Sequence, residues 1–226
     1  MTFQPIRLHR HPLSGHSHRV ELMLSLLGLV SERVEVDLLQ GEHKRPAFLA
    51  LNPFGQVPVL EDDGLVISES NAILVYLAKR YGAAHWLPDD PAGAAAVERW
   101  LSIAAGPLVS GPATARLITV FGAQHDAELA IARSHSLLRI LEAELRDRDH
   151  LVGSSPTIAD VALYTYVAHA PEGNVDLGPY PSVRAWLERI EKLPGFVAMR
   201  ASAVGLRRAD VACANDRCED DACEAI

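Results

Sequence analysis

The hydrophobic pattern of the chain changes near residue 83, and this change limits the folds available to it. Before that point, short runs of alternating apolar residues are interleaved with runs that repeat every three or four residues. Alternation is typical of strands, and the longer repeat is typical of amphipathic helices. After that point only the helical repeat recurs. We therefore expect an α/β domain followed by an all-α domain.

The first part is expected to follow the order β-α-β-α-β-β-α. Asp63 and Gly64 separate two apolar runs, and an Asp-Gly pair in that setting is typical of a tight hairpin turn. Gly28 and Gly82 each follow a helical repeat and are expected to end a helix. The predicted elements are strands over 6–9 and 33–39, a hairpin over 57–67, helices over 20–27 and 47–51, and a helix from 68–70 to Gly82.

The second part follows a connector rich in proline and aspartate. Pro107 and Pro112 are expected to interrupt its first helix, because an interior proline kinks a helix. The predicted core-facing residues of two helices are Val97, Trp100, Leu101 and Ala104, and Leu137, Ile140, Leu141 and Leu145.

The helix that follows Pro156 is apolar around nearly its whole circumference, so we expect it to be buried. Thr157 and Asp160 have the spacing of a capping box, which a buried helix needs for its free N–H groups. We interpret Asp160 as a structural cap and not as a catalytic acid. The predicted domain organisation is an α/β domain over 1–83, a linker over 84–91, a helical domain over 92–205, and an acidic tail over 206–226 that we expect to be disordered.

Charge and cysteine content exclude several classes of protein. The formal net charge is −8, and six acidic residues follow residue 209, so neither nucleic acid nor an anionic membrane is an expected partner. The N-terminus has no apolar signal-peptide core, and no apolar run is long enough to span a bilayer. The only cysteines are Cys213, Cys218 and Cys223, which excludes a disulfide scaffold and indicates a cytoplasmic protein. Their spacing of five also disfavours a metal or redox role for the tail.

Serine and histidine cluster at the start of the first predicted helix, in "HPLSGHSH". Ser14 and Ser17 are suited to capping the helix or to meeting a ligand there. The histidines here and in the preceding strand suggest a metal site, but no acidic or cysteine ligand lies nearby, so we predict no metal. Arg19 is expected to face solvent or the other domain.

The blocks "GEHKRPAFLALNPFGQVP", "ES", "PTIADV" and "YPSVRAWLERIEKLPGF" make the chain resemble the glutathione S-transferase family across most of its length. The resemblance implies a thioredoxin-like N-terminal domain and an all-helical C-terminal domain. It also implies an enzyme that takes glutathione as cosubstrate, needs no metal, and forms a homodimer in the cytoplasm.

The resemblance assigns a tripeptide site to six residues. A cis bond between Val57 and Pro58 implies that the Val57 backbone pairs with the cysteinyl part of glutathione. Ser70 and the adjacent helix amides are suited to the γ-glutamyl carboxylate, and Glu69 to its ammonium group. His43 and Gln56 match positions that hold the glycine carboxylate. Many relatives have lysine in place of Gln56, and the neutral amide bonds an anion less strongly.

The thiol-activating group is expected in the Ser14–Ser17 segment. These serines have the spacing of a C-x-x-C pair but carry no sulfur, which excludes a disulfide reductase, and no tyrosine precedes the helix. The chain therefore resembles a serine-type transferase, in which a hydroxyl and the helix N-terminus stabilise the glutathione thiolate. Ser14 is the first candidate and Ser17 the second, and His16 is left as a helper or a solvated loop residue.

The predicted function is conjugation of glutathione to a small hydrophobic electrophile, as in detoxification. The expected electrophile site is lined by small apolar residues: Ala104, Ala105, Leu108 and Val109. The alternative is a non-catalytic binding or regulatory protein on the same scaffold, because fold resemblance alone does not determine function.

Overall fold

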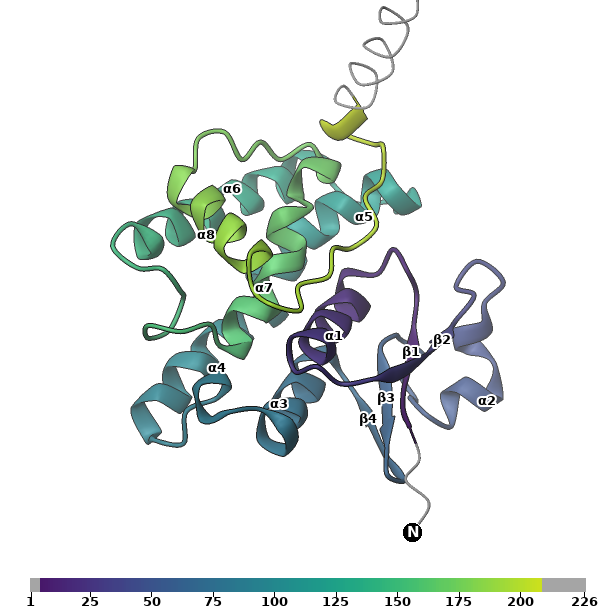
Figure 1. The fold of residues 1–226 in the computed structure, drawn as a ribbon. Coiled ribbons are helices and arrows are strands. Elements are labelled where there is room, and N and C mark those ends of the chain that lie inside the picture. Colours follow the sequence, from purple (N-terminus) through teal and green to yellow (C-terminus); the bar gives the residue numbers. More distant parts are fainter. Residues whose placement is uncertain (1–4, 209–226) are drawn as a thin grey trace, which may run out of the picture.

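The computed structural model of the protein describes residues 5–208 and confirms the predicted fold class (Figure 1). A mixed four-stranded sheet with its helices comes first, and the remaining described residues contain helices and connecting loops but no strand. The elements of the first part are β1 (Ile6–Arg10), α1 (Gly15–Leu26), β2 (Ser31–Glu35), η1 (Glu42–Lys44), α2 (Pro46–Leu49), β3 (Val59–Asp62), β4 (Leu65–Ser68) and α3 (Ser70–Tyr81).

The strands pair in the order β2-β1-β3-β4. β1 runs parallel to β2 and antiparallel to β3, with Leu8 opposite Leu60. β3 and β4 form the predicted hairpin. Its turn residues Asp63 and Gly64 have φ values of 49° and 82°, which is the geometry that two-residue hairpin loops favour.

The second strand is shorter and lies earlier than we predicted. β2 ends at Glu35, which pairs with Arg10, the last residue of β1. No partner strand continues beyond Arg10, so the alternating residues after Glu35 lie outside the sheet. The alternation reflects the burial of Val36 in a small core with Phe48 and Val59, and not strand pairing.

Side chains of β3 divide the core between the two faces of the sheet. Val59 packs with Val36 and Phe48 of α2 on one face. The neighbouring Leu60 points to the other face, as alternation requires, and belongs to the large core that contains α1 and α3. This large core continues without a break into the helical part, so α1 lies between the sheet and α7 (Figure 1).

The helical part begins after the short turn η2 (Ala84–Trp86). Its elements are α4 (Pro91–Ala105), η3 (Val109–Ala113), α5 (Thr114–Phe121), α6 (Ala127–Leu145), α7 (Ile158–Ala168), η4 (Ala170–Gly173) and α8 (Pro181–Glu191). The predicted interruption is confirmed, since α4 ends before Pro107 and η3 is a single π-helical turn that contains Pro112. No helix of the described part is both long and apolar enough to cross a membrane.

α7 is the buried helix that the sequence predicted. Every one of its residues is buried, and both halves of the Thr157–Asp160 capping box are present. Asp160 Oδ1 also accepts hydrogen bonds from Leu151 N at 3.0 Å and Trp186 Nε1 at 2.9 Å. The carboxylate thus joins α7 to α8 and to the preceding loop, which is a structural role.

The prediction for one core residue of α6 is wrong. Ile140 is 50% exposed, whereas Leu137, Leu141 and Leu145 are buried. At about 100° per residue, the buried leucines span a narrow stripe and Ile140 falls outside it. The predicted domain boundaries stay predictions, and Cys213, Cys218 and Cys223 lie outside the described residues.

Candidate active site

A cavity of about 400 Å³ lies where the start of α1, the loop before β3, the start of α3 and the end of α4 meet. Its lining residues are His16, Arg19, Asn52, Gln56, Val57, Pro58, Glu69, Ser70, Asn71, Ala104, Ala105 and Val109. Five of the six residues predicted to bind the tripeptide are among them, brought together from separate segments of the chain. Because both parts of the fold contribute walls, the site exists only in the folded chain.

The loop before β3 reaches the cavity through Val57 and Pro58, and the bond between them is cis. Asn52 holds this loop: its Nδ2 donates to the Gln56 carbonyl oxygen at 2.8 Å, and its Oδ1 accepts from Phe54 N at 3.1 Å. Asn52 was not predicted as a site residue. The Asn52-Pro53 pair is typical of a turn and therefore predicts a loop, but it gives no indication that Asn52 lines a cavity.

Glu69 and Ser70 stand at the start of α3. Glu69 is the N-cap residue with φ at 68° and makes no capping hydrogen bond through its side chain. A left-handed backbone is costly for a residue other than glycine and is concentrated at functional sites. Ser68 is the last residue of β4, and Glu69, not Ser68, occupies the N-cap position.

Arg19 was predicted to face solvent or the other domain; the solvent alternative is wrong, and Arg19 lines the cavity to which the helical part also contributes. It is 1% exposed, and its Nη1 donates to Ser70 Oγ at 3.0 Å and to Asn71 Oδ1 at 2.8 Å. Burial lowers the pKa of its guanidinium to about 10, so the group remains charged at neutral pH. No sequence signal distinguished it from an exposed arginine, because the burial comes from the packing of α1 between other elements.

His16 is the member of the Ser14–Ser17 segment that lines the cavity. Its Nδ1 lies 3.3 Å from Ser70 Oγ. The Ser70 oxygen accepts from Arg19 and has a second lone pair, so the tautomer of His16 decides whether Ser70 accepts from the His16 ring or donates to it. Burial, together with the charge of Arg19, lowers the pKa of His16 to about 3. His16 is therefore neutral and only weakly basic at physiological pH.

The two predicted catalytic serines organise the start of α1. Ser14 is the N-cap, and its Oγ accepts from Ser17 N at 3.2 Å. Ser17 is fully buried, and its Oγ accepts from His11 N at 3.3 Å. Neither serine is among the residues lining the cavity. Between them, Gly15 packs so closely on Tyr166 that an added Cβ would lie 2.6 Å from Tyr166 Cζ.

Two other predicted features fall outside the cavity. His43 does not line it, and the pKa of this histidine is lowered by partial burial and by the charge of Lys44. Leu108, expected beside the electrophile, is fully buried, whereas Ala104, Ala105 and Val109 do line the cavity. Their small apolar side chains form the wall contributed by the helical part.

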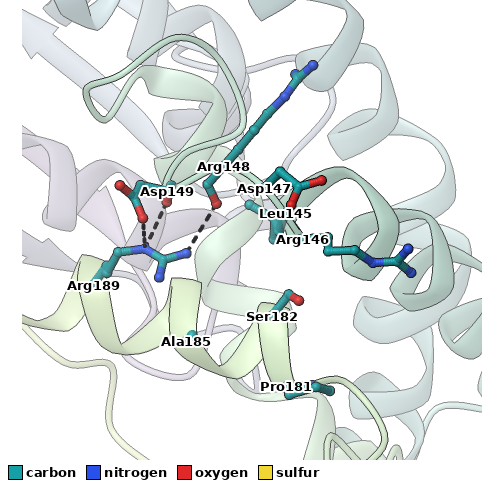
Figure 2. Close-up of a pocket in the computed structure, with 9 residues that line it drawn as sticks. All are labelled: Leu145, Arg146, Asp147, Arg148, Asp149, Pro181, Ser182, Ala185 and Arg189. Atoms are coloured by element: carbon teal, nitrogen blue, oxygen red, sulfur yellow. Dashed lines mark hydrogen bonds and ion pairs between the residues drawn. The ribbon is translucent and has the colours of Figure 1, made fainter.

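A second hollow, of about 380 Å³, lies between the end of α6 and α8 (Figure 2). Its most prominent polar contacts are internal, since Arg189 donates to the Asp149 and Arg148 carbonyl oxygens at 3.0 and 3.4 Å. It contains none of the predicted site residues. Among residues 5–208, no group of three or more potential metal ligands is close enough to hold an ion.

The chain matches two protein-family models. The model of the glutathione S-transferase N-terminal domain matches residues 4–79, and that of the C-terminal domain matches residues 108–194. A curated relative, glutathione S-transferase 3 of Zea mays, is 37% identical over 207 residues, covering 85% of this chain and 91% of the relative.

Solved structures agree with these matches. A crystal structure of a possible glutathione S-transferase from Rhodopseudomonas palustris has a TM-score of 0.81 and 36% identity, covering 88% of this chain and 100% of the other. A glutathione transferase homologue from Drosophila mojavensis, solved with bound glutathione, has a TM-score of 0.77 and 28% identity, covering 84% and 89%. By these matches and by its fold, the chain belongs to the glutathione S-transferase family of enzymes.

Proposed function

We propose that this protein binds glutathione in the cavity between α1, α3 and α4 and activates its thiol for attack on a small hydrophobic electrophile. The observation that carries the proposal is the meeting of Val57, Glu69 and Ser70 in one cavity with the start of α1. In this cavity, three short segments that are far apart in the sequence provide the polar groups that a charged tripeptide needs.

The γ-glutamyl end would bind at the start of α3. The Ser70 hydroxyl and the first backbone N–H groups of α3 are suited to its carboxylate, because a helix N-terminus favours an anion. The Arg19 charge beneath Ser70 adds to this preference. Glu69, whose side chain is not used for capping, would bind the ammonium group.

The rest of the tripeptide would extend along the loop before β3. The Val57 backbone would pair with the cysteinyl residue, and Gln56 would donate to the glycine carboxylate. His43 lies beyond the cavity lining, and we propose that it contacts the same carboxylate at the outer edge of the site.

The cysteinyl sulfur would then lie near the start of α1. A thiol with a pKa near 8.5 is mostly protonated at pH 7, and lowering that pKa by about two units takes roughly 2.7 kcal/mol. A hydrogen bond to a charged group contributes about 1.5–3 kcal/mol, and the helix dipole adds to it. Ser14 is the proposed donor, since its Oγ accepts one bond and keeps its own proton available. Ser17 is the alternative, and its complete burial makes it the weaker one.

The electrophile would bind against Ala104, Ala105 and Val109, which together form a small apolar wall. We extend the proposal to a detoxifying role for a homodimer in the cytoplasm, on the strength of the family. The oligomeric state is checked by light scattering of the purified protein.

Calorimetric titration with glutathione, combined with conjugation assays on a panel of aryl halides and other electrophiles, tests the proposal. Binding with conjugation supports it. Absence of binding at millimolar glutathione overturns it. Binding without conjugation of any electrophile indicates instead a non-catalytic glutathione-binding or regulatory protein.

A further inference from the structure

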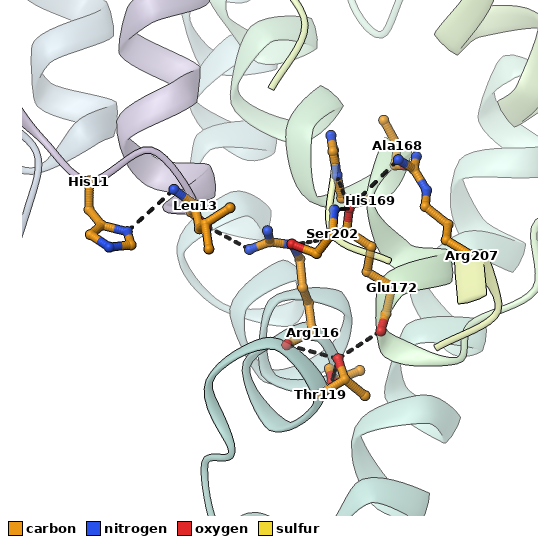
Figure 3. Close-up of polar contacts among 10 residues, drawn as sticks. His11, Leu13, Arg116, Thr119, Ala168, His169, Glu172, Ser202 and Arg207 are labelled. Carbon is orange, nitrogen blue, oxygen red and sulfur yellow. Dashed lines mark hydrogen bonds and ion pairs between the residues drawn. The ribbon is translucent and has the colours of Figure 1, made fainter. Parts of the chain in front are cut away.

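A buried arginine of the helical part reaches the turn that precedes Ser14 (Figure 3). Arg116 lies on α5 and is 2% exposed. Its Nη1 donates to the Leu13 carbonyl oxygen at 2.8 Å, and its Nε donates to Glu172 Oε2 at 2.6 Å. One guanidinium thus connects the interior of the helical part to the residue immediately before the N-cap of α1.

The peptide group between Leu13 and Ser14 is held at both of its ends. Its carbonyl oxygen accepts from Arg116, and its N–H, which belongs to Ser14, donates to the His11 carbonyl oxygen at 2.9 Å. A peptide group is planar, so bonds at its two ends restrict the orientation of the whole plane. The position of the Ser14 Cα atom, and of the first turn of α1, depends on that orientation.

Glu172 keeps Arg116 in this place. The carboxylate is fully buried in η4, and its Oε1 accepts from His169 Nδ1 at 2.7 Å and Ser202 N at 3.0 Å. Burial opposes ionisation, but the hydrogen bonds from His169 and Ser202 and the charge of Arg116 outweigh it and lower the pKa of Glu172 to about 2. A carboxylate that is charged at neutral pH therefore accepts from Arg116 Nε, while Arg116 Nη1 donates to Leu13.

We propose that Arg116 is a positioning residue for thiol activation, orienting the Leu13–Ser14 peptide so that the Ser14 hydroxyl and the α1 amides face the glutathione sulfur. This inference rests on the proposed function. Arg116 does not line the cavity, so it acts on the thiol through Ser14 and not on the bound tripeptide. Its loss should therefore raise the pKa of the bound thiol while leaving glutathione binding unchanged at a pH low enough for the bound thiol to be protonated.

The variant Arg116→Lys tests this separation. A lysine ammonium can still pair with Glu172 but lacks the planar fork that serves two acceptors at once. We expect glutathione affinity measured at roughly pH 5, where the bound thiol is protonated, to stay at the wild-type value. The pKa of the bound thiol should rise, and kcat should fall on the order of 10- to 100-fold. The thiol pKa is read from the ultraviolet absorbance of the bound thiolate across a pH series.

Arg207→Met is the matched control. Arg207 Nη1 lies 3.6 Å from the same Glu172, but the arginine makes no contact with Leu13 among the described residues. This variant removes a cation from the cluster and should leave the thiol pKa unchanged. An equal thiol pKa in Arg116→Lys and the wild type, or an equal shift in Arg207→Met, overturns the positioning role.

The double variant Arg116→Met/Glu172→Gln covers the case in which Arg116→Lys does not fold. It removes both buried charges together, which proteins tolerate better than the loss of one partner. The same rise in thiol pKa is expected, and an unchanged pKa overturns the inference. A wild-type protein that binds no glutathione refutes the proposed function itself, whereas unchanged variants beside an active wild type refute only the role of Arg116.

Discussion

Arg19 and Ser70 are joined by a hydrogen bond of 3.0 Å in the wall of the cavity, from Arg19 Nη1 of α1 to the hydroxyl oxygen of the first residue of α3. This bond ties together the two helix starts that the proposed mechanism uses. In that mechanism the start of α3 would meet the γ-glutamyl carboxylate and the start of α1 would meet the sulfur. The same hydroxyl oxygen lies 3.3 Å from His16 Nδ1, so one side chain at the start of α3 contacts two side chains of α1.

Ser70→Ala should weaken glutathione binding by roughly 10- to 100-fold, because a hydrogen bond to a charged group contributes about 1.5–3 kcal/mol. Calorimetry measures the effect directly. Ser102→Ala, at an exposed position of α4, is the matched control and should bind as the wild type does. If both variants bind glutathione equally well, Ser70 does not hold the carboxylate.

Ser14→Ala should leave glutathione affinity nearly unchanged and shift the pH dependence of kcat/KM upward by about one to two pH units, because the thiolate loses its donor. Comparison with Ser17→Ala and His16→Gln, under the same conditions, identifies the donor among the three. A wild-type profile for Ser14→Ala would transfer the role to whichever of the other variants shows the shift.

Asp160→Ala should destabilise the protein by about 3 kcal/mol or more, because buried N–H groups of Thr157, Leu151 and Trp186 lose their acceptor. Urea unfolding measures the change. Asp126→Ala removes the exposed N-cap of α6 and should cost only about 1 kcal/mol. Similar losses for the two variants would contradict the central place of Asp160 in the helical part.

Protonation of His18 should destabilise the fold in mild acid. Burial lowers its pKa from 6.5 to about 4, so between these values the unfolded chain binds a proton that the folded chain does not. The free energy of unfolding should therefore fall as the pH drops from 6.5 toward 4, by at most about 1.4 kcal/mol per pH unit from this group.

The variant His18→Gln isolates this contribution. It should be less stable than the wild type at pH 8, because His18 donates from Nε2 to the Val197 carbonyl oxygen and contacts Thr165 Oγ1. Its stability should then change less with pH between 6.5 and 4. His125→Gln, at an exposed position, is the control. Parallel pH curves for His18→Gln and the wild type would rule out His18 as the titrating group.

Sequence patterns predicted turns, caps and helix breaks correctly where the conformation of a segment depends on its own residues. The Asp63-Gly64 hairpin turn, the Thr157–Asp160 capping box and the break at Pro112 all occur as predicted, because turn chemistry, capping and the missing proline N–H act within a few residues. The alternation of apolar residues after Glu35 led to a wrong prediction of a longer strand. The alternation comes from the burial of Val36 in the small core and not from strand pairing.

The site was predicted in part. Gln56, Val57, Pro58, Glu69 and Ser70 line one cavity as the family resemblance implies, whereas Ser14, Ser17 and His43 lie outside its lining. Asn52, Arg19 and Arg116 were missed. Arg19 and Arg116 donate hydrogen bonds to residues far from them in the sequence, and Asn52 donates to the backbone of its own loop. The spacing of residues along the chain contains no signal for such contacts.

The sequence by itself determined the order and type of the helices and strands, the turns and caps that bound several of them, and which family the chain resembles, since these depend on the order of side chains along short segments. Only the tertiary structure decided that Arg19 is buried beneath Ser70, that His16 is neutral and faces the cavity, and that Arg116 holds the Leu13 carbonyl. The physical reason is that charge state, tautomer and hydrogen-bond partner depend on the desolvation and neighbours that each side chain meets when α1 packs between the sheet and the helical part.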